Sequence, residues 1–367
     1  MKPIKIALIS PSESIISETF IQQHKKYLAG NVLYYFNGFL PTRNDRKGFL
    51  LNGNEKIVYS LKKMLKVSDF SINEQALINS FKKEKIEVVV AEYGQTGVAV
   101  LNVCKYLEIP IISIFHGYDA SVKKVLNEYS IDYKRLFVYS KRIIAVSNKI
   151  RETLINLGCE ENKVIVTPCA PDNSFFELKP TFLSQTFFGV GRFVDKKAPY
   201  YTILAFYKVL LEFPHAKLLL AGDGPLFNTC ANLIKNLGIE DSVKLLGAIT
   251  SKEVKENLVK ATAFVQHSIV ALNGDSEGTP VAILEASAAG LPVISTFHAG
   301  ISDVVINNKT GFLVEEHDID EMSEKMMLVL GNIDYYKTMG AEGRRNVREN
   351  FTKDIHIDII NKAIKLP

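Results

Sequence analysis

The sequence predicts an α/β protein made of two doubly wound domains, each a parallel sheet covered by helices. Short β-branched and apolar runs alternate with helical stretches from end to end, the order typical of parallel sheets with crossover helices. The 367 residues suffice for about two domains of roughly 100–200 residues each. A breaker-rich stretch, Thr167-Pro-Cys-Ala-Pro-Asp-Asn-Ser, interrupts the alternation near the middle of the chain.

The first half contains candidate strands that share short runs of Ile, Val, Leu and Phe. They are Lys5–Ile9, Val32–Phe36, Val88–Ala91, Ile111–Phe115 and Ile143–Val146. We place the domain boundary near residues 168–180 and expect residues 1–170 to form the first domain.

The second half repeats the alternation with a further set of strands. They are Phe187–Val190, Lys217–Ala221, Val243–Leu246, Ala263–Val265, Val293–Ser295 and Phe312–Val314. We expect residues 171–350 to form the second domain, and residues 351–367 to form a helix that packs back on the first. Two doubly wound domains facing each other leave a cleft at the carboxyl ends of their strands, where such folds bind ligands.

The net charge of +4 is unevenly distributed. Residues 1–175 carry 24 Lys and Arg against 17 Asp and Glu, whereas residues 176–367 carry 20 against 23. A basic half is consistent with an anionic membrane surface, an anionic substrate or simply a solvated surface. We do not expect nucleic acid as a partner, because the Lys pairs lack interleaved aromatic or Gly-rich patterns.

The chain starts without an apolar run of signal-peptide length, and its longest apolar stretches fall short of the ~20 residues that span a membrane. We therefore expect a cytoplasmic protein. Its cysteines have neither metal-ligand nor redox spacing, and its histidines are scattered, so we expect reduced thiols and no catalytic metal. The cysteines are Cys104, Cys159, Cys169 and Cys230.

The segment from Asn273 to Ser295 holds the most informative pattern. Thr279 is a candidate N-cap, Pro280 fits the first helical position, and Gly290 is a typical stop, so we expect a helix from Pro280 to about Ala289. The Glu285 carboxylate is the one charge on this apolar helix, and burying it is costly unless it has a partner.

Glu285 lies five residues beyond Pro280, about 7–8 Å along the helix axis. That distance separates the phosphates of a nucleotide from its ribose hydroxyls. Phosphates could accept from the Gly278 and Thr279 amides at the helix N-terminus, and Glu285 from the ribose. The alternative is that Glu285 belongs to a core ion pair and that Glu277 only complements the helix dipole.

The string Glu277-Gly-Thr-Pro…Glu285-Ala…Gly-Leu-Pro-Val resembles the hallmark of the retaining glycosyltransferases of family 4, two glutamates in E-G-x-P…E-A…G-x-P-V. The resemblance implies a GT-B fold over nearly the whole chain, retention of anomeric configuration and no catalytic metal. It also implies that Glu277 contacts the donor sugar and Glu285 the ribose. The Asn273-Gly-Asp-Ser-Glu-Gly and His298-Ala-Gly-Ile strings resemble the branch that makes capsular, colanic-type and other exopolysaccharides.

Two further segments of the second half are similar to the family's pattern. In Val190-Gly-Arg-Phe-Val-Asp-Lys-Lys-Ala-Pro, the resemblance places Arg192 and Lys197 on the donor pyrophosphate, although Ala198 stands where the family usually has Gly. In Ala221-Gly-Asp-Gly-Pro-Leu it brings Gly222 and Gly224 close to the nucleotide. A tight structural turn explains these two glycines equally well.

In the first half, Phe115-His-Gly-Tyr-Asp ends a predicted strand. By resemblance, His116 reaches the hydroxyls of the donor sugar and acts with Glu277 in catalysis, while Asp119 helps to shape the acceptor side. The loop after the first strand lacks the Gly-rich turn of many relatives. Ser14, on the acceptor side, or Ser17 could substitute for it, and the simpler alternative is that these serines cap a helix.

Residues 54–67 predict a basic amphipathic helix that could dock on an anionic membrane, or pack as an ordinary helix with a solvated face. We conclude that the sequence favours transfer of a sugar from UDP- or GDP-sugar to a glycan hydroxyl, and we expect a lipid-linked acceptor. The alternatives are a sugar-nucleotide epimerase of similar fold and a non-catalytic subunit that binds nucleotide sugars.

Overall fold

The computed structural model describes residues 2–13, 19–51, 53–64 and 69–365, and the chain divides into two compact units. Unit 1 contains residues 1–167 and 356–367, and unit 2 contains residues 168–355. The polypeptide therefore passes between the units at two junctions, Thr167–Pro168 and Ile355–His356.

Unit 1 is built on an eight-stranded sheet in the order β4-β3-β2-β1-β5-β6-β7-β8. From β2 to β8 along the sheet the neighbours pair in parallel, and β3 pairs antiparallel with both β2 and β4. The strands are β1 (Lys5–Ile9), β2 (Asn31–Phe36), β3 (Arg43–Asn44), β4 (Gly48–Phe49), β5 (Val88–Glu92), β6 (Ile111–Phe115), β7 (Arg142–Ala145) and β8 (Val164–Val166).

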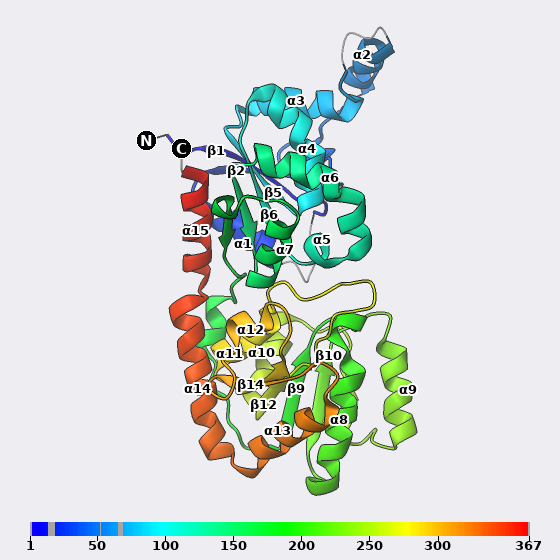
Figure 1. Ribbon diagram of the computed structural model, residues 1–367, viewed down its shortest axis with the longest axis vertical. Coiled ribbons are helices and arrows are strands. Elements are labelled where there is room, and N and C mark those ends of the chain that lie inside the picture. Colours follow the sequence, from blue (N-terminus) through cyan, green and yellow to red (C-terminus); the bar gives the residue numbers. More distant parts are fainter. Residues whose placement is uncertain (1, 14–18, 52, 65–68, 366–367) are drawn as a thin grey trace. The chain divides into compact units, whose positions relative to one another are not determined.

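Helices flank this sheet (Figure 1). The start of α3 is fixed by a capping box, in which Ser71 and Glu74 satisfy each other's backbone N–H groups. The helices are α1 (Thr19–Tyr27), α2 (Gly53–Met64), α3 (Ile72–Glu84), α4 (Gly94–Leu107), α5 (Tyr118–Ser121), α6 (Lys123–Tyr139), α7 (Asn148–Asn156) and η1 (Glu161–Lys163), and α15 (Lys353–Lys365) enters unit 1 at His356.

Unit 2 is built on a six-stranded parallel sheet in the order β11-β10-β9-β12-β13-β14. The chain adds β10 and β11 on one side of β9 and then returns to add β12 on the other, which creates a topological switch point beside β9. The strands are β9 (Thr186–Val190), β10 (Lys217–Ala221), β11 (Val243–Leu245), β12 (Ala263–Val265), β13 (Val293–Thr296) and β14 (Gly311–Val314).

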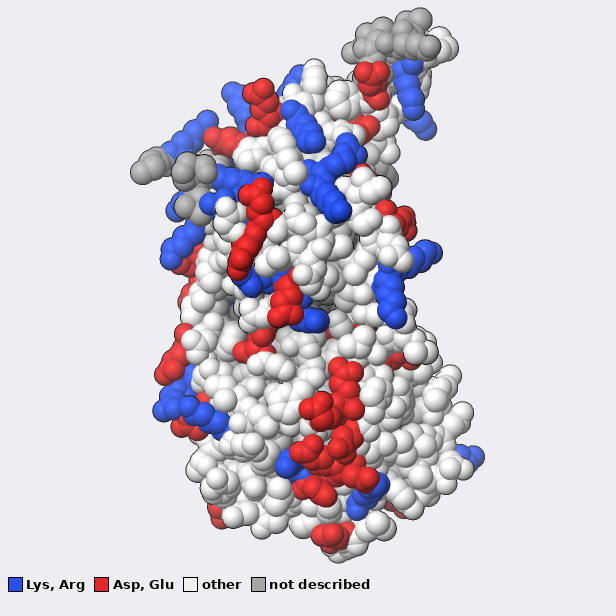
Figure 2. Space-filling view, viewed as in Figure 1, with Lys and Arg blue, Asp and Glu red and all other residues white. Residues whose placement is uncertain are grey.

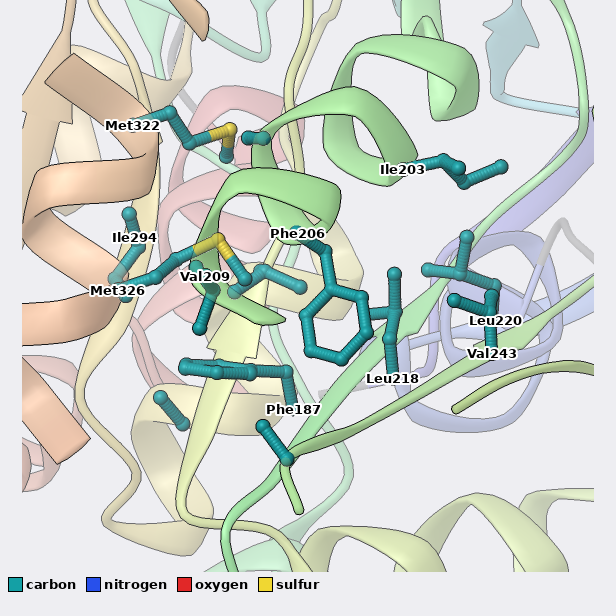
Figure 3. Packing of buried hydrophobic residues seen from close by; sticks show 14 of the residues in the cluster. Phe187, Ile203, Phe206, Val209, Leu218, Leu220, Val243, Ile294, Met322 and Met326 are labelled. Carbon is teal, nitrogen blue, oxygen red and sulfur yellow. The ribbon is translucent and has the colours of Figure 1, made fainter. Parts of the chain in front are cut away.

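The core of unit 2 contains Phe187 of β9 packed edge-to-face on Phe206 of α8, with Met322 and Met326 of α13 nearby (Figure 3). This packing holds the sheet rigidly beneath the loops that leave its strands. The helices are η2 (Asn173–Glu177), η3 (Asp195–Lys197), α8 (Pro199–Glu212), α9 (Phe227–Leu237), α10 (Ser251–Lys260), α11 (Val281–Ala289), α12 (Ile301–Val304), α13 (Ile319–Gly331) and α14 (Ile333–Asn350).

The structure confirms all the predicted strands, each within one residue at either end. The sequence pattern did not predict β3, β4 and β8, because two or three residues are too few to show a period. Of the predicted basic helix at residues 54–67, the structure describes Gly53–Met64 as α2, and residues 65–67 lie outside the described residues. Among the described residues, no helix combines the length and apolarity needed to cross a bilayer.

Candidate functional site

The loop before α11 brings a buried glutamate against a lysine from the neighbouring β9–α8 connection. Glu277 is only 5% exposed, and its Oε2 atom lies 3.1 Å from Lys197 Nζ. Lys197 Nζ also donates to Gln266 Oε1 at 3.2 Å, just beyond the end of β12. Two connections, β9–α8 and β12–α11, therefore meet at the carboxyl edge of the sheet, beside the switch point.

The charges around Glu277 keep its carboxyl ionised. Burial alone would raise the pKa of Glu277, but Lys197, Lys196 and His298 lower it below its ordinary value. Lys197 occupies the Oε2 atom, whereas the buried Oε1 atom has no hydrogen-bond partner among the described residues. A buried acceptor without a partner is rare in folded proteins, and it is suited to accept from a ligand hydroxyl.

Two side contacts hold the Glu277 loop in place. The Glu277 N–H donates to His298 Nε2 at 3.1 Å, and His298 Nδ1 lies 2.5 Å from Glu316 Oε1. On the other side, Lys196 Nζ donates to Asp275 Oδ1 at 2.9 Å and to a carbonyl of the same loop. The Glu277 loop is therefore held on one side by His298 and on the other by Lys196, while Lys197 contacts the carboxylate itself.

The start of α11 differs from the prediction. The helix begins at Val281 with Pro280 as its N-cap, so the expectation that Thr279 is the N-cap and Pro280 the first helical residue was wrong. The Thr279 hydroxyl instead accepts from the Cys169 N–H at 3.0 Å. This leaves helix-terminal N–H groups without a side-chain cap. The predicted end is correct, because Gly290 adopts φ 84° and closes the helix.

Glu285 lies half-buried on α11 and forms neither an ion pair nor a hydrogen bond with any described residue. Burial raises the pKa of its carboxyl to about 8, although Lys255 opposes the shift and Asp172 adds to it. The alternative that Glu285 belongs to a core ion pair is therefore not supported.

The β10–α9 turn packs directly on the loop that carries Arg192. Gly222 has φ +130°, and a Cβ atom there would lie 1.9 Å from the Gly191 carbonyl oxygen. Gly224 has φ +152°, and its Cβ would lie 2.6 Å from the Phe193 oxygen. Only glycine fits at either position, so these residues fix the course of the Arg192 loop.

Arg192 itself is exposed at the end of β9. A small pocket of about 30 Å³ lies beside it, with Lys197 and Gln266 among its lining residues. Ala198 adopts the left-handed conformation, with φ 34° and ψ 53°. This is the position where the resemblance expects Gly, and the conformation accounts for that preference.

The predicted residues of the first half lie in unit 1. His116 follows β6, and its Nε2 atom lies 2.8 Å from Glu92 Oε2. Asp119 is fully buried and accepts from the N–H groups of Gly94, His116 and Gly117 at 2.9–3.1 Å. Asp119 thus shapes the His116 loop through the backbone. Ser14 and Ser17 lie outside the described residues.

Comparison with known proteins identifies the family. A model described as Glycosyltransferase Family 4 matches residues 42–175, and one described as Glycosyl transferases group 1 matches residues 176–346. A protein named as the colanic acid biosynthesis glycosyltransferase WcaL of Escherichia coli (strain K12) is 30% identical over 76% of this chain and 70% of its own length. The chain belongs to glycosyltransferase family 4. The family 4 enzyme is also 30% identical to the amylovoran biosynthesis glycosyltransferase AmsK of Erwinia amylovora, over 73% of this chain and 67% of AmsK.

Solved structures show the fold of this glycosyltransferase. Anabaena HepE in complex with UDP superposes over the full length of both chains with a TM-score of 0.78 at 15% identity. A glycosyltransferase from Rickettsia africae ESF-5 does so with a TM-score of 0.76 at 18% identity. The enzyme therefore has the GT-B fold, and as a member of its family it is a retaining, nucleotide-sugar-dependent glycosyltransferase.

The residues that hold the Glu277 loop of the glycosyltransferase have no recognisable pattern in its sequence. Lys196 adjoins Lys197 and looks like a second surface charge, yet it is 8% exposed and pairs with Asp275. His298 was part of a recognised string but had no predicted role. No sequence pattern predicts a role for Glu316 or Gln266, because their contacts depend on strand order rather than on spacing along the chain.

Proposed function

We propose that the enzyme moves a sugar from UDP- or GDP-sugar to a hydroxyl of a glycan during assembly of a bacterial exopolysaccharide. Two of its relatives are named for the biosynthesis of colanic acid and of amylovoran, and each aligns with most of this chain. Structures of HepE are described with UDP and with UDP-glucose, which supports a nucleotide-sugar donor of this kind.

One observation carries the donor assignment: Glu285 is a half-buried carboxylate on α11 with no ionic partner among the described residues. It lies four residues after the first helical residue, Val281, or about 6 Å along the axis. Ribose hydroxyls that donate to Glu285 would supply the missing partner while the phosphates lie at the helix N-terminus. Each such hydrogen bond contributes about 0.5–1.5 kcal/mol to the protonated carboxyl, and about 1.5–3 kcal/mol once the carboxyl is ionised.

The same arrangement suits the diphosphate. The buried Gly278 N–H has no acceptor among the described residues, and the uncapped start of α11 adds the positive end of the helix dipole. Arg192 and Lys197 supply cations from the adjoining loop. These groups stabilise the negative charge that builds on the departing nucleoside diphosphate.

Retention requires that the new bond form on the face that the diphosphate leaves. In the mechanism that we propose, the bond from the anomeric carbon to the phosphate oxygen breaks as the bond to the acceptor oxygen forms on the same side. The acceptor's proton passes to the departing phosphate oxygen. The unpaired Oε1 atom of Glu277 accepts from a sugar hydroxyl, and His116 orients the sugar from unit 1.

A lipid-linked acceptor fits the surface of unit 1. On the face shown in Figure 2, Lys and Arg side chains are spread over unit 1 among acidic ones, whereas the largest cluster of acidic side chains lies over unit 2. On α2, Ile57 is 62% exposed and Met64 70% exposed, next to the exposed Lys56 and Lys63. Apolar side chains flanked by lysines are the composition that docks on anionic bilayers.

A pocket beside α2 strengthens the lipid proposal. It has a volume of about 600 Å³ and combines an apolar lining with two lysines. The lining residues include Phe49, Leu50, Leu51, Lys56, Lys63, Ile72 and Ala76. An acceptor with an acyl or prenyl chain and a phosphate head would satisfy both kinds of side chain.

Vesicle co-sedimentation tests the membrane part. The enzyme should bind vesicles that contain phosphatidylglycerol and not pure phosphatidylcholine vesicles, and Ile57→Glu/Met64→Glu should abolish the binding. The matched control is Ile131→Glu/Val138→Glu, which changes two exposed apolar residues of α6. Equal binding by both double variants would contradict docking through α2.

A transfer assay tests the function as a whole. Radiolabelled UDP- and GDP-sugars are incubated with a lipid-linked or a free glycan acceptor, and the product is analysed for its anomeric configuration. We expect transfer with retention from one donor class, and none in Glu277→Gln/Glu285→Gln. Epimerisation or hydrolysis of every donor, without transfer to any acceptor, would contradict the proposal.

A further inference from the structure

A chain of buried polar side chains runs through unit 1 behind His116. His116 Nε2 lies 2.8 Å from Glu92 Oε2, and the other oxygen, Oε1, lies 2.6 Å from His24 Nδ1. His24 Nε2 then meets His356 Nε2 at 2.8 Å, and His356 Nδ1 meets the Thr167 hydroxyl at 2.9 Å. Four successive hydrogen bonds thus join a histidine at a strand end to residues far along the sequence.

The Thr167–His356 end of this series of hydrogen bonds lies at the two junctions between the units. Thr167 is the last residue of unit 1 before the first junction, and His356 is its first residue after the second. The hydrogen bond between them ties the outgoing and returning segments together. The hydrogen bonds from His356 to His24 and from Glu92 to both His24 and His116 therefore connect the junctions to His116.

Burying these polar side chains costs free energy unless each of their hydrogen bonds is made. Glu92 and His24 are fully buried, and His356 and Thr167 are each 2% exposed. A buried carboxylate loses several kcal/mol of hydration unless its partners replace it. Burial alone would raise the pKa of Glu92, but His24 and the hydrogen bonds from both histidines lower it to about 2. Glu92 is therefore an acceptor on both oxygens.

An ionised Glu92 fixes the protons on the neighbouring rings. It must receive N–H from His116 Nε2 and from His24 Nδ1. His24 Nε2 can then accept from His356 Nε2–H, and His356 Nδ1 can accept from the Thr167 O–H, so each of the four hydrogen bonds has one donor and one acceptor. Phe20 stacks on the His116 ring with centroids 4.4 Å apart, and Asp119 accepts from the His116 backbone N–H.

We propose that Glu92 is a positioning residue that holds His116 as the Nε2–H tautomer, and that Thr167 and His356 tie this state to the two junctions. The inference rests on the proposed role of His116 in sugar transfer. It goes further by assigning the groups that set the ring's proton and orientation. His116 would then present an unprotonated Nδ1 as a hydrogen-bond acceptor.

Nitrogen NMR of histidine-labelled enzyme tests this assignment without any substrate. The His116 signals, identified by their loss in His116→Gln, should report the Nε2–H tautomer in the wild type. They should shift in Glu92→Gln, whose amide cannot accept from both rings, and in Thr167→Val, which removes the hydroxyl at nearly constant volume. Thr167→Ser, which keeps the hydroxyl, is the matched control and should retain the wild-type signals.

Kinetics give the second readout. Glu92→Gln should lower kcat about 10–100-fold with little change in the KM for the donor, and Thr167→Val should lower kcat by a smaller factor that Thr167→Ser restores. An Nδ1–H tautomer in the wild type, or unchanged His116 signals in both Glu92→Gln and Thr167→Val, would overturn the inference. Full turnover in His116→Gln would instead remove the catalytic role of His116 from the proposed function.

Discussion

The Nζ atom of Lys197 lies 3.1 Å from the Oε2 atom of Glu277, so the first glutamate of the motif is bound to a cation that we place beside the diphosphate. In the proposed site, the pair joins the group that we assign to the sugar to a group that we assign to the diphosphate. Burial lowers the pKa of Lys197, while Glu277 opposes that shift. Each group therefore depends on the other for its charge.

The first prediction concerns turnover in Glu277→Gln. The amide keeps the shape of the side chain but cannot neutralise Lys197, so kcat should fall about 10²–10³-fold while donor affinity changes much less. Steady-state kinetics and donor titration measure the two effects separately. Glu256→Gln, on the exposed face of α10, is the control. A loss of donor affinity as large as the loss of turnover would contradict the role in sugar transfer.

The second prediction concerns the glycine turn. A Cβ at Gly222 would lie 1.9 Å from the Gly191 carbonyl oxygen, so Gly222→Ala must displace the Arg192 loop. We expect a loss of more than about 2 kcal/mol in the free energy of unfolding and weaker donor binding. Gly238→Ala is the matched control, because its φ is +65° and its Cβ meets no atom within 4 Å. It should cost only about 1 kcal/mol. Equal melting temperatures for the two variants would refute the argument.

The third prediction concerns stability and pH at Glu285. Burial raises the pKa of this carboxyl from 4.5 to about 8, so the folded state binds its proton more tightly than the unfolded chain does. The stability that this proton confers is complete below the unfolded pKa and is lost as pH rises through the folded one. Glu285→Gln should therefore stabilise the apo enzyme near pH 8.5, by about 1–3 kcal/mol, and barely affect it near pH 4.5. Urea unfolding at both pH values measures the difference, and an equal effect at both would contradict the assigned pKa.

The fourth prediction concerns His298. Its Nε2 atom accepts from the Glu277 N–H, and its Nδ1 atom pairs with Glu316. His298→Leu removes both contacts and should lower kcat about 10–100-fold without unfolding unit 2, because the loop loses its orientation. His298→Gln can still place an oxygen near the Glu277 N–H and should recover part of the activity. Indistinguishable kinetics for the two variants would show that the hydrogen bond does not position the loop.

The sequence predicted the parts of this enzyme that depend on local pattern. Strand positions follow from runs of apolar residues, and Glu277 and Glu285 are recognisable because their spacing lies within one continuous segment. The contacts of His298 with Glu316, and of Lys196 with Asp275, join segments separated by other strands, so no local pattern reveals them. The prediction that Thr279 is the N-cap of α11 was wrong for a similar reason. Its hydroxyl accepts from the N–H of Cys169, more than a hundred residues earlier in the sequence.

The His24–Glu92–His116 chain illustrates the same limit. Each histidine looks isolated in the sequence, and scattered histidines are usually unrelated. The parallel order β1-β5-β6 brings Glu92 at the end of β5 beside His116 after β6, and α15 returns His356 to unit 1. The strand order brings His24, Glu92 and His116 together, and a single sequence predicts that order only in part.

The central claim is that the ribose of the donor lies against Glu285, and calorimetry with UDP, GDP and their 2′,3′-dideoxy analogues tests it most directly. For the nucleotide that binds, removal of the hydroxyls should weaken affinity for the wild type about 10–100-fold, and should have little further effect on Glu285→Gln. An equal loss of affinity in the wild type and in Glu285→Gln would contradict the account.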